Sequence, residues 1–373
     1  MKIKLYQGST LTDATVAMIK SIDNSDMFSM HVIIVPDRFS LQCEKLVLQL
    51  FPQKAIFNVR VVTLTRFSVE LLSKLGVKLG KGDVLSSGET LLLTSRAIEN
   101  VQENFKTFKR GGIDFCYEIS KLISQFKSSG VAPEQLNSSA GGMTGNKYHD
   151  LSLIYNEYEK LLGDKLDANA RLSLLNEKLK NSKILSDTKI YFAQFDAFTK
   201  GGFNLIETFA ECADEVNISF TASQSIGNDY IYEKDIYEKI IKLSTEKGIN
   251  IDVEKKQALL SPQKEAIVKG LYSYQKVKCE NKGFYNLYSC SSNAEEVEAV
   301  AKLIRYLVFK GARYSDIQIA VGSLAKEQSQ IENIFSQYNI PFYIDTSVTA
   351  DKTILGNLVR SYFETAIMGY GFD

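Results

Sequence analysis

The sequence predicts an α/β protein with two parallel-sheet domains, the first of which is interrupted by an all-helical block. Strand and helix patterns alternate over residues 1–85, strand patterns then disappear until about residue 185, and they return beyond it. Because parallel strands are joined by crossovers that usually contain a helix, this alternation predicts a parallel sheet. We divide the chain into a first domain (1–85 and 186–283), a helical insertion (86–185) and a second domain (284–373).

The first domain opens with three predicted strand–helix pairs. We expect strands over residues 3–6, 31–35 and 59–64. Each is followed by an expected helix, over residues 13–21, 41–51 and 67–75. The continuous apolar run of the second strand, which stops at Pro36, is typical of a strand buried on both faces of a sheet. Gly76 is the expected end of the third helix.

The middle of the chain has helical patterns only, and the strand patterns then resume. We expect helices around residues 91–93, 115–126, 151–162 and 172–179. The Ser- and Gly-rich stretch 137–146 is predicted to be an exposed loop. Two further strands, over residues 189–192 and 216–220, are expected to flank a helix over 202–213. The polar stretch 244–261 is interpreted as a connector that leads out of the domain.

The last part of the sequence predicts a second α/β domain. We expect its strands over residues 286–289, 317–321 and 342–344, and its helices over residues 294–309 and 327–338. The final residues, 371–373, show no natural stopping feature, which we interpret as a truncation.

The composition is that of a soluble globular protein. Hydrophobic residues make up 45% of the 373 residues, and 44 basic residues balance 44 acidic ones. This balance gives no bulk sign of nucleic-acid binding, although a local basic groove is compatible with it. No apolar run suits a signal peptide or a membrane helix, so we expect a cytoplasmic protein without membrane contact. No two of the five cysteines have the spacing of zinc or iron–sulfur ligands, so we expect no metal site.

Several segments, spread over nearly the whole chain, resemble those of one protein family in their residues, order and spacing. They are residues 35–41 with Glu44, 61–67, 148–159, 190–199, 295–304, 316–317 and 340–345. Two α/β domains with a helical insertion in the first match the layout of superfamily 1 (UvrD-like) helicases. The segments narrow this likeness, so that the chain resembles the N-terminal part of the AddB family, the second subunit of AddAB DNA-break-processing complexes.

The resemblance implies a fold, a partner and a substrate. It implies two RecA-like, P-loop-type domains, an AddA-like helicase–nuclease subunit as partner, and a single- or double-stranded DNA end as the bound nucleic acid. It also implies that the nuclease domain of the family, with the cysteines of its iron–sulfur cluster, lies beyond residue 373. We therefore expect no cofactor in this chain itself.

The first strand–helix junction resembles a degenerate phosphate-binding loop. A working loop reads G-x-x-x-x-G-K-[ST], in which backbone amides and the Lys hold phosphates and the hydroxyl binds magnesium. The candidate nucleotide-site residues here are Gly8, Ser9, Thr10 and Thr15. Asp13 replaces the second Gly and Ala14 replaces the Lys, so a carboxylate stands where phosphate is needed and the cation is missing. The alternative is that Thr12 or Asp13 simply caps the helix that follows.

The second half of a nucleotide site is also altered. A strand that ends in Asp-Glu normally supplies the magnesium partner. The matching positions after the strand at 190–192 are Ala193 and Gln194. A shifted alignment that uses Asp196 is the alternative. Two independent losses predict no ATP hydrolysis and no catalytic residue in this chain, with ATP and magnesium not expected as cofactors.

The ends of the second and third strands carry candidate DNA-binding residues. They are Arg38, Phe39, Thr63, Thr65, Arg66 and Phe67. Arg and Thr side chains contact phosphate, and Phe rings offer a face on which bases stack. The alternative is that the two Phe residues belong to the core and Arg38 is a surface charge.

The sequence thus favours an inactivated helicase-like subunit fragment of an AddAB-type complex, acting as a DNA-binding scaffold in the processing and recombinational repair of double-strand breaks. Two alternatives remain open. One is a weak ATPase or DNA translocase with an atypical nucleotide site, and the other is a protein-binding α/β scaffold without DNA contact. An affinity for single-stranded DNA that falls with salt separates the last of these from the other two.

Overall fold

The computed structural model forms two compact units, Met1–Glu280 and Asn281–Asp373, and each is described by itself. The residues that the structure describes are 2–8, 10–23, 29–51, 57–80, 82–108, 111–137, 142–180, 182–221, 231–255, 285–346 and 353–368, with the isolated positions 263, 266–267, 278 and 280. The four-part division of the chain drawn from the sequence remains a prediction.

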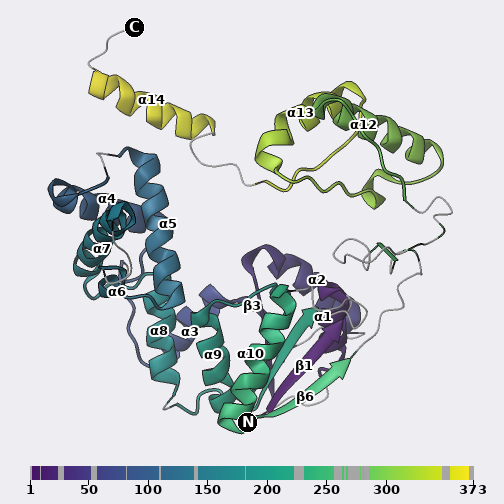
Figure 1. Cartoon of the computed structure of the whole chain (residues 1–373). Coiled ribbons are helices and arrows are strands. Elements are labelled where there is room, and N and C mark those ends of the chain that lie inside the picture. Colours follow the sequence, from purple (N-terminus) through teal and green to yellow (C-terminus); the bar gives the residue numbers. More distant parts are fainter. Residues whose placement is uncertain are drawn as a thin grey trace. The chain divides into compact units, whose positions relative to one another are not determined.

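Six parallel strands form the sheet of the first unit (Figure 1). In chain order they are β1 (Lys2–Gly8), β2 (Met30–Val35), β3 (Val59–Thr63), β4 (Thr188–Phe192), β5 (Glu215–Thr221) and β6 (Asn250–Lys255). Their order across the sheet is β3-β2-β4-β5-β1-β6. The predicted α/β class with a parallel sheet is therefore confirmed, and the five strands expected in the first unit are all present.

Strand β6 corrects one prediction, because the polar stretch 244–261 was expected to be a connector. Residues Asn250–Lys255 instead pair in parallel with β1 at the edge of the sheet, after α10 (Ile231–Lys247). An edge strand has one neighbour and needs few apolar side chains, so its sequence does not show the apolar run of a central strand. The pairing with β1 makes this segment a strand.

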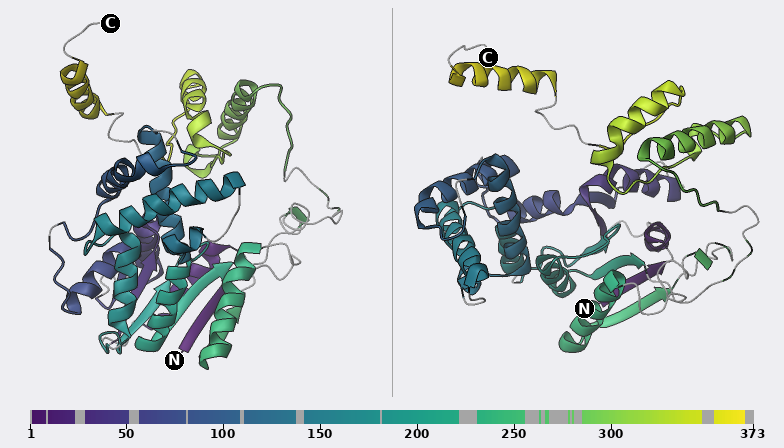
Figure 2. Two further views of the ribbon diagram at one scale, coloured as in Figure 1. Left: turned by 60° about the vertical axis from the view of Figure 1, so that its left-hand side comes forward. Right: turned by 45° about the horizontal axis from the view of Figure 1, so that its top comes forward.

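Helices cover both faces of the sheet, as Figure 2 shows. One face packs against α3 (Leu64–Lys74), α8 (Ala168–Leu179), α9 (Lys200–Cys212) and α10 around the larger apolar core. The other face packs against α1 (Leu11–Lys20) and α2 (Ser40–Leu50) around a smaller core that includes Met18, Ile33 and Val47. In strands β1 to β4, alternate residues enter the two cores, because successive side chains point to opposite faces.

Between α3 and β4, the described residues form helices and 3-10 turns and contain no named strand. These are α4 (Ser87–Val101), η2 (Gln102–Asn104), α5 (Ile113–Ser129), α6 (Pro133–Asn137), α7 (Gly142–Leu162) and α8. Helices α4, α5 and α7 share an apolar core of their own, around Ile119, Ile154 and Tyr158. Since α7 begins at Gly142, part of the stretch expected as a loop is helical, and residues 138–141 lie outside the described residues.

A charge network, in which Lys127 and Asp167 are largely buried, joins three of these helices. Lys127 of α5 lies 2.7 Å from Glu159 of α7 and 2.5 Å from Asp167, the residue that caps α8. Tyr158 also donates its hydroxyl to Asp167 at 3.2 Å. Charges that leave water need close partners to offset the loss of hydration, and here each has at least one.

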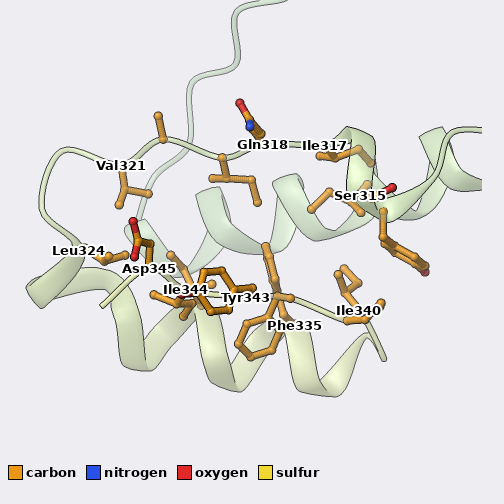
Figure 3. A pocket seen from close by; sticks show the side chains of 17 residues that line it. Ser315, Ile317, Gln318, Val321, Leu324, Phe335, Ile340, Tyr343, Ile344 and Asp345 are labelled. Carbon is orange, nitrogen blue, oxygen red and sulfur yellow. The ribbon is translucent and has the colours of Figure 1, made fainter. Parts of the chain in front are cut away.

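The second unit departs from the sequence-based expectation. Its helices are α12 (Asn293–Phe309), α13 (Leu324–Gln337) and α14 (Ile354–Met368), with a 3-10 turn, η3 (Tyr314–Asp316). The predicted strands at 286–289, 317–321 and 342–344 are not formed, although all three ranges are described. Figure 3 shows residues 317–321 and 340–345 running alongside each other in the same direction over the helices. Their apolar side chains pack on α12 and α13, but among the described residues no ladder of backbone hydrogen bonds makes them strands.

Candidate functional site at the carboxyl edge of the sheet

Both predicted sites lie at one edge of the sheet. Because all strands are parallel, the turns that follow them leave from the same side. The register pairs Val35 with Thr63 in β2 and β3, and Ile34 with Phe192 in β2 and β4. Ligands of open α/β sheets bind outside this carboxyl edge. The loop predicted to be a degenerate nucleotide site and the loops predicted to bind DNA therefore lie at the same edge of the sheet.

The turn between β1 and α1 is very short. Strand β1 ends at Gly8 and α1 begins at Leu11, so that only two residues separate them. Thr10 caps the helix, accepting the Asp13 N–H at 3.1 Å and donating its hydroxyl to the Asp13 carboxylate at 2.7 Å. The capping residue is therefore Thr10, where the sequence suggested Thr12 or Asp13. Ser9 lies outside the described residues.

Gly8 is required by close packing of the turn. A Cβ atom at this position would lie 2.6 Å from the Ala14 nitrogen and 2.8 Å from the Thr10 carbonyl oxygen. Both contacts are with backbone atoms, which have little freedom to move. The glycine that matches the phosphate-binding motif thus has a structural reason to be present that needs no nucleotide.

The β1–α1 turn does not fit a magnesium nucleotide. The N–H groups of Asp13 and Ala14 already bond to Thr10, through its hydroxyl and its carbonyl oxygen. The Asp13 carboxylate places negative charge in the first turn of α1, where a phosphate would otherwise be favoured by the helix dipole. Ala14 is fully buried and supplies no cation.

The hydroxyl of Thr15, which a working site would offer to magnesium, is bonded within the protein. Gln194 donates from Nε2 to Thr15 at 3.1 Å, the Thr15 and Ser219 hydroxyls lie 3.1 Å apart, and Ser219 donates to the Phe192 carbonyl oxygen at 3.3 Å. Since Thr15 accepts from Gln194 and Ser219 donates onward, Thr15 must donate to Ser219. The result is a chain of three hydrogen bonds in which Gln194 donates to Thr15, Thr15 donates to Ser219, and Ser219 donates to the Phe192 carbonyl oxygen.

The position after β4 offers no clear metal ligand. Ala193 is fully buried, Gln194 adopts a left-handed backbone conformation with φ of 64°, and Asp196 is exposed. No group of three or more His, Cys, Asp or Glu side chains that could hold a metal ion occurs among the described residues. Ser219 was missed by sequence reasoning. Its signal was a polar residue inside a strand, at a position that alternates with the apolar residues Ile218 and Phe220 of β5.

The loops after β2 and β3 present two cations. Arg38, in a short turn (η1, Asp37–Phe39), and Arg66, in the first turn of α3, are both exposed. Thr63 caps α3 by accepting the Arg66 N–H at 3.3 Å, and Thr65 is exposed beside it. These loops are neighbours because β2 and β3 are paired.

The two phenylalanines of these loops differ. Phe39 is half-buried and packs against the smaller core. Phe67 is only 3% exposed and lies in the larger core, with its ring centre 6.1 Å from that of Phe209. The prediction that Phe67 offers a stacking face is therefore wrong. The ring points from the first turn of α3 into the sheet, so a base cannot reach it.

A family model described as "ADDB, N-terminal" matches residues 7–268. The chain belongs to this family. Similar proteins, each named as the B subunit of an ATP-dependent helicase/deoxyribonuclease, include one from Clostridioides difficile, 30% identical over 374 residues, and one from Clostridium acetobutylicum, 26% identical over 364 residues. The matches cover 92% of this chain but only 32% and 31% of those relatives. The protein of Acetivibrio thermocellus is 26% identical over 98% of this chain and 34% of its own length.

The AddB-family chain therefore spans about a third of the length of these relatives. Their shared name speaks of a helicase and a deoxyribonuclease. Among the helices in the described part of this chain, none combines the length and the apolar character needed to cross a bilayer.

A cavity of about 860 Å³ lies in the second unit (Figure 3). Ile317, Val321, Phe335 and Ile344 are among its mainly apolar lining residues, and Asp345 is its carboxylate. No Lys or Arg of the described residues lines it. This chemistry does not suit a phosphate, so the carboxyl edge of the first unit is the stronger candidate site for nucleic acid.

Proposed function

We propose that this chain is a helicase-like scaffold that holds DNA within an AddAB-type complex and does not hydrolyse ATP itself. Its partner would be an AddA-like helicase–nuclease subunit, and its role would lie in processing the ends of double-strand breaks for recombinational repair. The family membership and the relatives named as part of a helicase/deoxyribonuclease support this proposal. Since the chain spans about a third of those relatives, the helicase and nuclease activities belong to the proposed whole assembly.

The observation that most supports the proposal is the difference between the β1–α1 turn and the loops after β2 and β3. The β1–α1 turn is filled by its own contacts, through Thr10, Asp13 and Thr15. The loops after β2 and β3, farther along the same edge beyond β5 and β4, present Arg38 and Arg66 to solvent. Exposed guanidinium groups bind phosphates well, because their fork of donors matches two oxygens at once. This edge favours contact with a nucleic-acid backbone over the turnover of a nucleotide.

The free cysteines support a reducing compartment, and we place the protein in the cytoplasm. Cys43 and Cys116 are buried and unbonded to each other or to another cysteine. Burial raises the pKa of the Cys43 thiol to about 11, so it remains a protonated, apolar side chain near neutral pH.

The proposal is tested by capture of the tagged chain from its native cells, followed by identification of its companions by mass spectrometry. An AddA-like helicase–nuclease at near-equal amount supports the proposed assembly. Folded chain that returns alone, or with unrelated proteins, contradicts it.

A second measurement separates the remaining functions. The purified chain is titrated with a fluorescent single-stranded oligonucleotide at several salt concentrations, and phosphate release from magnesium–ATP is followed with and without DNA. We expect salt-dependent binding and no ATP turnover. Turnover above a heat-denatured control would favour a weak ATPase or translocase, and absence of salt-dependent binding would favour a scaffold for protein only.

A further inference from the structure

A hollow lined by groups that could bind a nucleotide lies in the helical part of the first unit, away from the β1–α1 turn. It has a volume of about 550 Å³ and lies between α5 and α7. Phe126 from α5 and Tyr148 and Leu151 from α7 form an aromatic and aliphatic lining. Lys147 of α7 and Thr107, from the loop before α5, add an ammonium group and a hydroxyl. The hollow thus combines flat apolar surface with groups that bind anions.

The loop that carries Thr107 is held in place by hydrogen bonds to a buried carboxylate. The Asp150 carboxylate is fully buried and accepts the N–H groups of Lys106, Thr107 and Phe108 at 2.8, 2.7 and 3.0 Å. Phe105 and Phe108 pack against the helical core, with ring centres 6.1 Å apart. Lys106 and Thr107, between these anchors, are exposed. The backbone is therefore held in one conformation that displays a cation and a hydroxyl.

The Asp150 carboxyl group remains ionised in this position, as the direction of its pKa shift indicates. Burial by itself raises the pKa of the carboxyl group, but the three backbone N–H groups outweigh burial and hold the pKa of Asp150 below its usual range. The carboxylate therefore stays charged at neutral pH and keeps its hold on the loop.

Lys147 is an available cation. Two other lysines of these helices are neutralised, since Lys127 pairs with Glu159 and Asp167, and Lys160 pairs with Glu157. Lys147 forms no ion pair with any carboxylate among the described residues. A free ammonium group beside an aromatic wall suits one nucleotide, because the phosphate meets the cation while the base lies on a ring.

We propose that the hollow between α5 and α7 binds one nucleotide of a single DNA strand, with its base on the Phe126–Tyr148 lining and its phosphate on Lys147 and Thr107. This site rests on the proposed DNA-binding function and adds a contact separate from the Arg38–Arg66 loops. Asp150 acts as a positioning residue, because it holds the loop and does not itself line the hollow.

The test uses the purified chain and a fluorescent oligothymidylate, with anisotropy measured over a range of salt. Lys147→Ala should weaken binding and reduce the slope of log affinity against log salt by about 0.7, the value for one single-strand phosphate contact. Tyr148→Leu keeps apolar volume but removes the ring, so it should weaken binding about tenfold and leave the slope unchanged. Lys160→Ala, on the same helix, is the matched control and should change neither quantity.

An abasic strand of equal length distinguishes stacking from a merely structural role of Tyr148. Without bases, wild type and Tyr148→Leu should bind with equal affinity. Lys147→Ala should still show the smaller slope of log affinity against log salt. If wild type binds the oligonucleotide and both variants match it, the nucleotide site is overturned while the proposed function stands. If wild type shows no salt-dependent binding, the proposed function fails and the site fails with it.

Discussion

Gln194 donates a hydrogen bond to the hydroxyl of Thr15 at 3.1 Å, although the two residues are 179 positions apart in the sequence. In a working magnesium–nucleotide site, the residues at these two positions would both face the metal. Here they bond to each other, and Thr15 passes the chain on to Ser219. The polar side chains of Thr15, Gln194 and Ser219 are thus part of the internal hydrogen bonding of the first unit.

This relationship predicts a measurable coupling between the two residues. Thr15→Val removes the hydroxyl at nearly constant volume, and Gln194→Asn shortens the side chain while tolerating the left-handed backbone. Each change should lower the free energy of unfolding by about 1–3 kcal/mol, since a buried donor or acceptor loses its partner. Denaturant unfolding of both variants and the double variant should give a coupling of about 1 kcal/mol, and strict additivity would contradict the direct bond.

Gly8→Ala should destabilise the first unit. The new Cβ would lie 2.6 Å from the Ala14 nitrogen, so β1 and α1 must move apart, at a cost of about 2 kcal/mol. The control is Gly88→Ala in α4, where an added Cβ meets nothing within 4 Å and alanine favours the helix. Thermal unfolding should show a loss for the first variant and none for the second. Equal melting temperatures would contradict the close approach.

Acid should weaken the first unit partly through Glu70. Two hydrogen bonds from Arg60, at 2.9 and 2.8 Å, lower the pKa of Glu70 from 4.5 to about 2, and Lys74 adds to the effect. A lowered folded-state pKa means that the stabilisation is complete above about pH 4.5 and disappears as the pH falls toward 2.

The measurement is the free energy of unfolding against pH for wild type and Glu70→Gln. The variant should lose less stability between pH 5 and about 2, because it has no carboxylate to protonate. The effect will be modest, since the Arg60 and Glu70 side chains are 38% and 26% exposed and water screens the pair. Parallel curves for the two proteins would contradict the assignment.

Arg38→Ala and Arg66→Ala should each weaken binding of single-stranded DNA and reduce its salt slope by about 0.7, because each removes one phosphate contact. The double variant should lose about twice that slope. Lys20→Ala serves as the control, since Lys20 is exposed at the end of α1, at the opposite edge of the sheet. Anisotropy titrations that show equal losses for all three single variants would point to nonspecific charge effects.

The central part of the fold was readable from the sequence. Strand β2 was predicted over 31–35 and spans Met30–Val35, because a strand buried on both faces requires a continuous apolar run. Strand β6 was missed because only Ile251 and Val253 of its six residues are apolar, so that it lacks such a run; its pairing with β1 makes it a strand. In the second unit, residues 317–321 have the apolar run but no hydrogen-bonded neighbour, so the strand prediction there was wrong.

The sequence predicted only part of the candidate site. The sequence shows which residues occupy the predicted nucleotide positions, and the carboxylate of Asp13 and the missing cation at Ala14 predict that no phosphate binds there. It does not show that Thr10 caps the helix, that Ser219 closes the hydrogen-bond chain, or that Phe67 faces the core. Each of these depends on contacts between elements that lie far apart in the chain or on the exact start of a helix.

By itself, the sequence determined the α/β class, the alternation of strand and helix, the family, and the presence of Asp13 and Ala14 after the first strand, because these follow from local periodicity and residue identity. The tertiary structure decided which polar side chains were bonded internally and which remained exposed. Hydrogen bonds and burial depend on distances in space, and only folding brings Thr15, Gln194 and Ser219 within 3.1 Å of one another in turn.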